Sequence, residues 1–188
     1  VTEALELAGR ELTIPVVYNC GGYENPDVIR ALKPYVDVWL PDLKYFDGSL
    51  AARCSGAGDY FSHAAPAILQ MVRQTGPPVL DENGLMKSGV LIRHMVLPGH
   101  REDSIRLLGW IRDSLPGHQY YISLLSQYTP FFLVRDTDRY PDLNRRLTTY
   151  EYQKVVDAAL ELGLSEGYMQ KKSSAGEEYT PPFDLEGV

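Results

Sequence analysis

Short apolar segments of strand length alternate along this chain with segments whose apolar residues recur at helical spacing. Four strand-like segments end in polar side chains next to glycine or proline: residues 14–23, 37–45, 89–99 and 120–130. They are too apolar to leave one face in water, as in parallel sheets that helices cover. The alternation therefore predicts an α/β fold with a parallel sheet, in which ligands bind at the carboxyl ends of the strands. The pattern alone leaves open whether the sheet is open or forms a barrel.

Local signals place the elements between these strands. Helices are expected to begin where a side chain can cap free backbone N–H groups, at Asn25, at Asp103 or Ser104, and at Thr148. Residues 81–84 predict the turn of a small hairpin, and residues 167–170 a last short strand. The segment 14–18 reads as a buried strand. Residues 131–144 have no regular pattern.

Composition narrows the class of protein. With 188 residues, 44% hydrophobic and 23% charged, the chain has the make-up of one folded domain. A net charge of −7 gives no support for binding nucleic acid or an anionic membrane, because phosphate contacts need a basic face. No apolar run approaches the roughly 20 residues of a membrane span, and no signal-peptide pattern opens the chain. We therefore expect a cytoplasmic protein.

The cysteines and acidic residues do not predict a metal site. Cys20 and Cys54 stand too far apart for a CxxC motif and are too few for a disulfide framework or a four-thiolate site. Cys54 is most simply a small buried residue. No local run of histidine, aspartate or glutamate has the spacing of metal ligands. We expect no metal-binding residue in this chain.

Polar side chains gather at the ends of the strand-like segments. They are Asn19 and Cys20; Asp42 and Lys44; Arg93 and His94; and Ser126, Gln127 and Tyr128. Because parallel strands end at one edge of a sheet, we expect many of these side chains to lie near one another. No nucleophile with a neighbouring histidine stands out, which argues against hydrolase chemistry.

Charge complementarity at this edge suggests a zwitterionic small molecule as ligand. Asp42 and Lys44 are two residues apart, so on an extended strand they project to the same side, as an ion pair or as part of a binding site. Arg93 lies in an apolar strand, where an unpaired guanidinium is costly, so it needs the carboxylate of Asp42 or of a ligand. His94 points the opposite way and is expected in the core or at an interface. Arginine and lysine would hold the ligand's carboxylate, and Asp42 its amine.

In this order and spacing, the four segments resemble the strand ends of radical S-adenosylmethionine enzymes. The matching stretches are residues 17–23, 37–45, 91–99 and 123–130. The resemblance is to proteins similar to pyruvate formate-lyase activating enzyme, and it extends through the closing residues 182–188. It implies a partial TIM-type barrel of the (β/α)6 kind with parallel strands. Residues 1–170 would form the C-terminal part of that barrel and residues 171–188 a docked tail.

The resemblance also implies roles for individual residues. Asp42 and Lys44 match an aspartate-x-lysine strand end that helps to hold the methionyl part of S-adenosylmethionine, and Arg93 matches a strand arginine directed into the same site. Asn19 falls where the activating enzymes usually carry an aspartate, so a cation-binding role for that carboxylate does not carry over. Cys20 matches a threonine or serine position, which favours loop packing.

Two further positions, Gln127 and Tyr128, fall near a family position that approaches the nucleoside. With Asn19, Asp42, Lys44 and Arg93 they complete the expected cofactor-binding set. We expect these residues to position the cofactor, and we expect no catalytic residue within the chain.

The family's CxxxCxxC loop, which binds a 4Fe–4S cluster through three thiolates, has no counterpart in this sequence. The chain opens within a helical pattern with no strand before it, so we expect it to be the C-terminal portion of a longer radical S-adenosylmethionine protein. The resemblance implies that this parent is a cytoplasmic oxidoreductase that reductively cleaves S-adenosylmethionine to a 5′-deoxyadenosyl radical. Its partners would be a glycyl-radical-type enzyme or other protein substrate, and an electron donor of the flavodoxin or ferredoxin class.

We expect the chain alone to be inactive and to bind neither the cluster nor S-adenosylmethionine. Two alternatives stay open. The chain is a complete, non-redox α/β domain that binds a small ligand or regulates a partner, or it is part of an aldolase-like barrel in which Lys44 forms a Schiff base. The carboxylate of Asp42 would favour the protonated amine, which counts against the second alternative.

Overall fold

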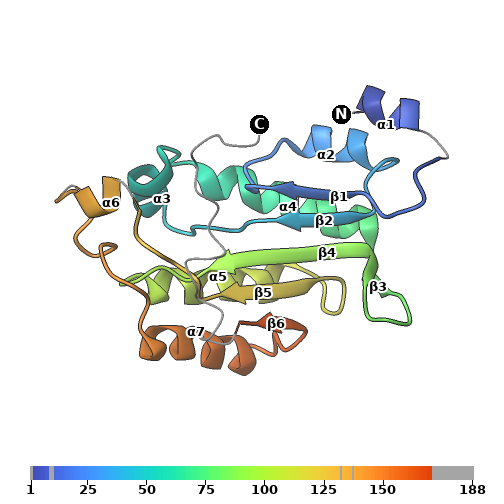
Figure 1. The fold of residues 1–188 in the computed structure, drawn as a ribbon. Helices are drawn as coiled ribbons and strands as arrows, with labels where there is room; N and C mark the ends of the chain where they lie inside the picture. The colour runs from blue at the N-terminus through green and yellow to red at the C-terminus, as the bar shows by residue number, and fades with distance from the viewer. Residues whose placement is uncertain (1, 9–10, 132, 137, 171–188) are drawn as a thin grey trace.

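The computed structural model describes residues 2–8, 11–131, 133–136 and 138–170 (Figure 1). In chain order the elements are α1 (Thr2–Ala8), β1 (Val17–Cys20), α2 (Pro26–Leu32), β2 (Val38–Pro41), α3 (Gly48–Ser55), α4 (Tyr60–Thr75), β3 (Val79–Leu80), β4 (Met86–Met95), α5 (Arg101–Ser114), β5 (Tyr121–Leu125), α6 (Leu133–Asp136), α7 (Thr149–Glu161) and β6 (Gly167–Met169). The tail predicted at residues 171–188 lies outside the described residues.

Five of the strands form a parallel sheet in the order β1-β2-β4-β5-β6. The short β3 pairs antiparallel with β4, which confirms the hairpin predicted around residues 81–84. An isolated parallel bridge joins Asp42 to Arg93 just beyond β2. The predicted α/β class and parallel sheet are therefore confirmed.

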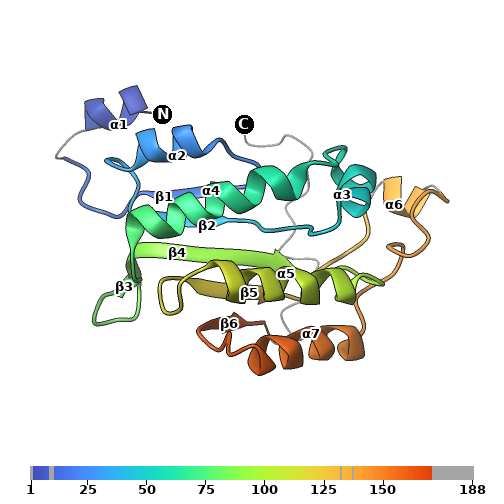
Figure 2. The ribbon, with the colours of Figure 1, turned by 180° about the vertical axis from the view of Figure 1, so that it is seen from behind.

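Helices α4 and α5 cover one face of the sheet, as the opposite views of Figures 1 and 2 show. Burial alternates along β4 with the two-residue period of a strand: Val90, Ile92 and His94 are buried on the helical side. The side chains of Arg93 and Met95 project to the other face and are more exposed. The sheet thus puts its core on one side and its polar strand ends on the other.

The segment 14–18 differs from the prediction. The strand runs from Val17 to Cys20 and lies at the edge of the sheet, with Val17 53% exposed. Pro15 has no N–H to donate to a ladder, and Val16 instead bonds Asp37 through its N–H and its carbonyl. Asn19 and Cys20 consequently lie within the strand.

Two of the three predicted helix starts are confirmed. Asn25 Oδ1 accepts from the N–H of Asp27, and Thr148 forms the full capping box with Glu151. The start at Asp103 or Ser104 is wrong, because α5 begins at Arg101. The Asp103 carboxylate does not cap its own helix; it accepts the backbone N–H groups of Phe46 and Asp47.

Among the described residues, no helix combines the length and the apolar character needed to cross a membrane.

Candidate functional site

Four of the predicted residues meet in one polar cluster at the carboxyl ends of β1, β2 and β4. Arg93 Nε donates to Asp42 Oδ1 at 2.9 Å, and Nη2 donates to Asn19 Oδ1 at 2.8 Å while lying 2.7 Å from Asp42 Oδ1 in an ion pair. Lys44 Nζ lies 3.8 Å from Asp42 Oδ2. The carboxylate that Arg93 requires is thus supplied by Asp42, and Asp42 and Lys44 project to the same side as predicted.

The cluster opens into a pocket of about 280 Å³. Its lining residues are Asp42, Lys44, Tyr45, Arg93, Met95, Leu97, Leu125 and Gln127. The Asp42, Lys44 and Arg93 side chains are 26%, 43% and 28% exposed, so their charges stay partly hydrated and open to a ligand. Opposite charges beside an apolar wall suit a small molecule with a charged end and an apolar body.

Tyr60, the first residue of α4, holds the backbone that carries this cluster. Its buried hydroxyl lies 2.8 Å from the carbonyl oxygens of Gly21 and Asp42, to which it donates, and accepts from the N–H of Lys44 at 3.1 Å. Burial raises the pKa of Tyr60, so the hydroxyl keeps its proton. Gly22 has φ of 83°, and a Cβ there would collide with the Asp42 carbonyl oxygen.

His94 supports the same strand end from the opposite face. It is 2% exposed, and its ring nitrogens lie 2.7 Å from the Leu43 carbonyl oxygen and 2.8 Å from Ser104 Oγ. Since a carbonyl only accepts, Nδ1 carries the proton and Nε2 accepts from the serine. Burial lowers the pKa of His94, which keeps the ring neutral. The prediction of a core histidine is confirmed.

Gln127 and Tyr128 fall on different sides of the chain after β5. Gln127 lines the pocket, and its Oε1 accepts from Nε2 of Gln170 at 3.0 Å. Tyr128 does not line it: its hydroxyl donates to the Leu143 carbonyl at 3.0 Å, and its ring lines a separate cavity. Neighbouring residues of extended chain project to opposite sides, which separates the two.

Two residues that hold the site were not among the predicted ones, namely Tyr60 and Gln170. Gln170 fixes the segment after β5: its N–H donates to the Leu124 carbonyl, and its Oε1 accepts from the N–H of Ser126 at 2.9 Å. Gln170 is a polar residue directly after β6. The signal that singled out Gln127, a polar side chain at the end of a strand, would therefore also have found Gln170. No local pattern marks Tyr60, which stands far from its partners in sequence.

Both cysteines are free thiols that lie partly buried in this fold. Burial raises the pKa of the Cys20 thiol to about 11, so it is protonated at neutral pH, and burial also raises that of Cys54. Both side chains pack against the core. Among the described residues, no three His, Cys, Asp or Glu side chains are grouped in a way that could hold a metal ion.

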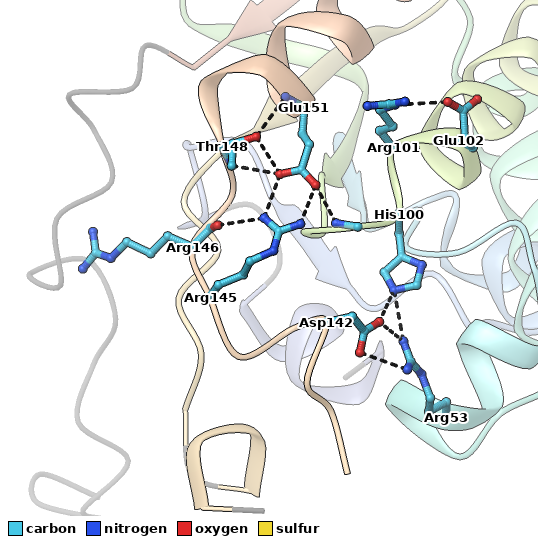
Figure 3. A network of polar contacts seen from close by, with 10 residues as sticks. Arg53, His100, Arg101, Glu102, Asp142, Arg145, Arg146, Thr148 and Glu151 are labelled. Carbon is cyan, nitrogen blue, oxygen red and sulfur yellow. Dashed lines mark hydrogen bonds and ion pairs between the residues drawn. The ribbon is translucent and has the colours of Figure 1, made fainter. Parts of the chain in front are cut away.

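Polar contacts tie the segment between β5 and α7 to the rest of the fold (Figure 3). Glu151 accepts from both Nη atoms of Arg145, from the N–H of Gly99 and from Thr148. Asp142 bonds Arg53 and His100. These hydrogen bonds hold the pKa values of Glu151 and Asp142 well below the ordinary carboxyl range.

Comparisons with known proteins agree with this architecture. No family model matches the chain. It is 29% identical over 147 residues to an uncharacterized protein of Methanocaldococcus jannaschii, covering 78% of this chain and 38% of that protein, so it spans well under half of that relative's length. It also resembles the crystal structure of a domain of pyruvate-formate lyase-activating enzyme from Bacteroides vulgatus, with a TM-score of 0.63 and 14% identity, covering 90% of this chain and 88% of that one. The shared fold is an α/β partial barrel that does not close, as predicted.

Proposed function

We propose that this chain is the C-terminal portion of a radical S-adenosylmethionine protein resembling pyruvate formate-lyase activating enzyme, and that its polar pocket positions the methionyl part of S-adenosylmethionine. One observation carries the proposal. Asp42, Lys44 and Arg93, the three residues assigned to that role by the sequence resemblance, line one pocket, and Asp42 pairs with both of the others.

The pocket's groups fit an amino acid head. The guanidinium of Arg93 and the ammonium of Lys44 can hold a carboxylate, while Asp42 can accept from an α-ammonium group. Met95 and Leu125 supply apolar wall beside them. These side chains bind and orient, and bond cleavage is not assigned to any of them.

A 4Fe–4S cluster does not fit this chain's own residues. Its two cysteines cannot supply three thiolates. The cluster would be held by a part of the protein that these 188 residues do not include, and it would supply the electron for reductive cleavage of S-adenosylmethionine. A glycyl-radical-type enzyme and a flavodoxin- or ferredoxin-class donor are the partners that this proposal entails.

The first test is the reading frame that encodes the chain. We expect a CxxxCxxC motif within about a hundred codons upstream of Val1, matching the three-thiolate ligation of the family. The second is iron analysis of the purified 188-residue chain after anaerobic reconstitution, with no stoichiometric cluster expected. Absence of the motif, or a full cluster on this chain alone, would contradict the proposal.

The role of the pocket is tested in the longer protein. We expect Lys44→Gln and Arg93→Gln to weaken S-adenosylmethionine binding about tenfold or more, since hydrogen bonds to charged groups are worth about 1.5–3 kcal/mol. Lys87→Gln is the matched control, because Lys87 pairs with Asp81 in the β3–β4 hairpin, away from the pocket. Equal affinities for Lys44→Gln and Lys87→Gln would refute the assignment.

A non-redox small-ligand-binding domain is the second candidate. The observation that favours it is that Asp42, Arg93 and Asn19 already satisfy one another without any cluster. It predicts a reading frame that lacks the cysteine motif. It also predicts that the chain alone binds a zwitterion, which calorimetry would measure.

A further inference from the structure

Gln170, which directly follows β6, continues the pairing of β6 with β5 through its side chain. Leu124 pairs with Met169 in the parallel ladder, and the N–H of Gln170 donates to the Leu124 carbonyl at 3.2 Å. The side-chain amide of Gln170 extends this pairing: its Oε1 accepts from the N–H of Ser126 at 2.9 Å, and its Nε2 donates to Oε1 of Gln127 at 3.0 Å. One residue thus bonds three residues at and just beyond the end of β5.

These contacts fix which way round each side-chain amide lies. A backbone N–H can only donate, so the Gln170 atom that faces the N–H of Ser126 must be the oxygen. The Gln170 atom that faces Gln127 is then the nitrogen, which can only donate, so the Gln127 atom beside it must be an oxygen. The orientation of both amides is therefore set by one backbone N–H group.

The Gln127 side chain consequently offers hydrogen-bond donors to the polar pocket. Gln127 lines this pocket, and its Oε1 is occupied by Gln170. Among the described residues its Nε2 has no hydrogen-bond partner, and it is not a fully buried group, so its N–H donors reach solvent. A ligand that enters the pocket displaces the water on Nε2, and only a ligand atom that accepts a hydrogen bond compensates for that loss.

Gln127 approaches the pocket from the strand end farthest from the carboxylate and the lysine. In the order β1-β2-β4-β5, the end of β2 leads to Asp42 and Lys44, and the end of β5 leads to Gln127. Neighbouring strands are about 4.8 Å apart, so about 10 Å separates β2 from β5. Met95 and Leu125, which pair in register, line the pocket with apolar surface. A ligand whose charged head binds at the end of β2 therefore presents its body to Gln127.

We propose that Nε2 of Gln127 selects a ligand whose body carries a hydrogen-bond acceptor, and that Gln170 is the positioning residue that holds Gln127 in its donor orientation. This inference rests on the proposed function, in which Asp42, Lys44 and Arg93 hold the amino acid head of S-adenosylmethionine. The body of that ligand carries such acceptors. A site that is built to donate a hydrogen bond discriminates strongly against a ligand that lacks the matching acceptor.

The orientation of the amides is tested in the purified chain by NMR of the ¹⁵N-labelled side-chain NH2 groups. The NH2 of Gln170 should be protected from exchange with water, and that of Gln127 should exchange like an exposed amide. In Gln170→Glu at neutral pH, the carboxylate accepts from the Ser126 N–H and requires a second donor. Gln127 should then turn over, and its NH2 should become protected. A protected Gln127 NH2 in the parent chain, or an unprotected one in Gln170→Glu, would overturn the inference.

Selection of the ligand is tested in the longer protein by calorimetric titration with S-adenosylmethionine. Gln127→Met keeps the length of the side chain and removes its donors, and we expect the affinity to fall about tenfold. Gln170→Glu should weaken binding at least as much, because it turns the Gln127 oxygen toward the ligand's acceptor. Gln153→Glu is the matched control, since Gln153 is exposed on α7 and bonds Asp157 there, and it should bind like the parent protein.

A double variant separates positioning from the added charge. Gln127→Met leaves no amide for Gln170 to orient, so adding Gln170→Glu to it should weaken binding no further. If the two losses add, the added charge or a distorted segment is the cause, and the positioning role is wrong. If the parent protein binds S-adenosylmethionine and both single variants bind it equally well, this inference fails and the proposed function stands. Failure of the parent protein to bind it would overturn both.

Discussion

Replacing Tyr60 with phenylalanine should loosen the strand end that carries Asp42 and Lys44. Tyr60 is 3% exposed, and its hydroxyl contacts three backbone groups. The substitution keeps the ring and removes only that hydroxyl. It leaves the Lys44 N–H without an acceptor, at about 1–3 kcal/mol, and deletes the single proton shared by two carbonyls, at about 1 kcal/mol. We expect a net loss of about 2–4 kcal/mol in the free energy of unfolding.

Thermal and urea unfolding of the purified chain measure this loss. At about 2–4 °C per kcal/mol for a domain of this size, the midpoint should fall by about 4–16 °C. Tyr35→Phe is the control, because the Tyr35 hydroxyl donates to Glu6 at an exposed position, where its loss should change the midpoint little. If Tyr60→Phe costs no more than Tyr35→Phe, the hydroxyl does not hold the strand end.

Two further predictions concern ionisation. Because the pKa values of Glu151 and Asp142 are lowered in the fold, their contribution to stability is fully present above the ordinary values of 4.5 and 3.8 and is lost as pH falls below them. Urea unfolding between pH 6 and pH 2, a span of about four units around those values, measures this contribution. The free energy of unfolding should fall less steeply with falling pH in Glu151→Gln than in the parent chain, and equal slopes would refute this. Burial raises the pKa of Cys20 from 9.0 to about 11, so its thiolate fraction at pH 8 should be about 100-fold lower than that of an ordinary thiol; iodoacetamide should alkylate it correspondingly slowly in the native chain and at the ordinary rate in urea.

The polar strand ends could be predicted because the requirement of each side chain can be read from its own segment. An arginine inside an apolar strand requires a carboxylate, and a carboxylate two residues from a lysine at the end of the next strand is available once the sheet is parallel. The structure joins Arg93 to Asp42 and extends the pair to Asn19. Helix caps at Asn25 and Thr148 were predictable for the same reason, since each bonds within three residues of itself.

Contacts between distant segments that do not lie on neighbouring strands could not be predicted in this way. Asp103 has the composition of a helix cap, yet it accepts from Phe46 and Asp47, which the fold brings to it from more than 50 residues away. Tyr60 likewise bonds Gly21, a residue 39 positions earlier. Val17 is exposed because β1 lies at the edge of the sheet. The β-branched residues of its segment predict a strand, but they do not say whether that strand is central or at the edge.

The charges of the polar pocket that Asp42, Lys44 and Arg93 line favour a zwitterion over a simple anion or cation. Asp42 already neutralises one of the two cations beside it, so a simple anion would compete with Asp42 for Arg93 and Lys44. A simple cation would compete with the same two side chains for Asp42. A zwitterion supplies both charges, and every side chain then exchanges one partner for another without leaving a desolvated charge unpaired. Since these side chains are 26–43% exposed before binding, the exchange strips little additional water from them. The amino acid head of S-adenosylmethionine, the ligand of the proposed function, would meet this requirement, so a closed ion-pair cluster is compatible with binding by the same residues.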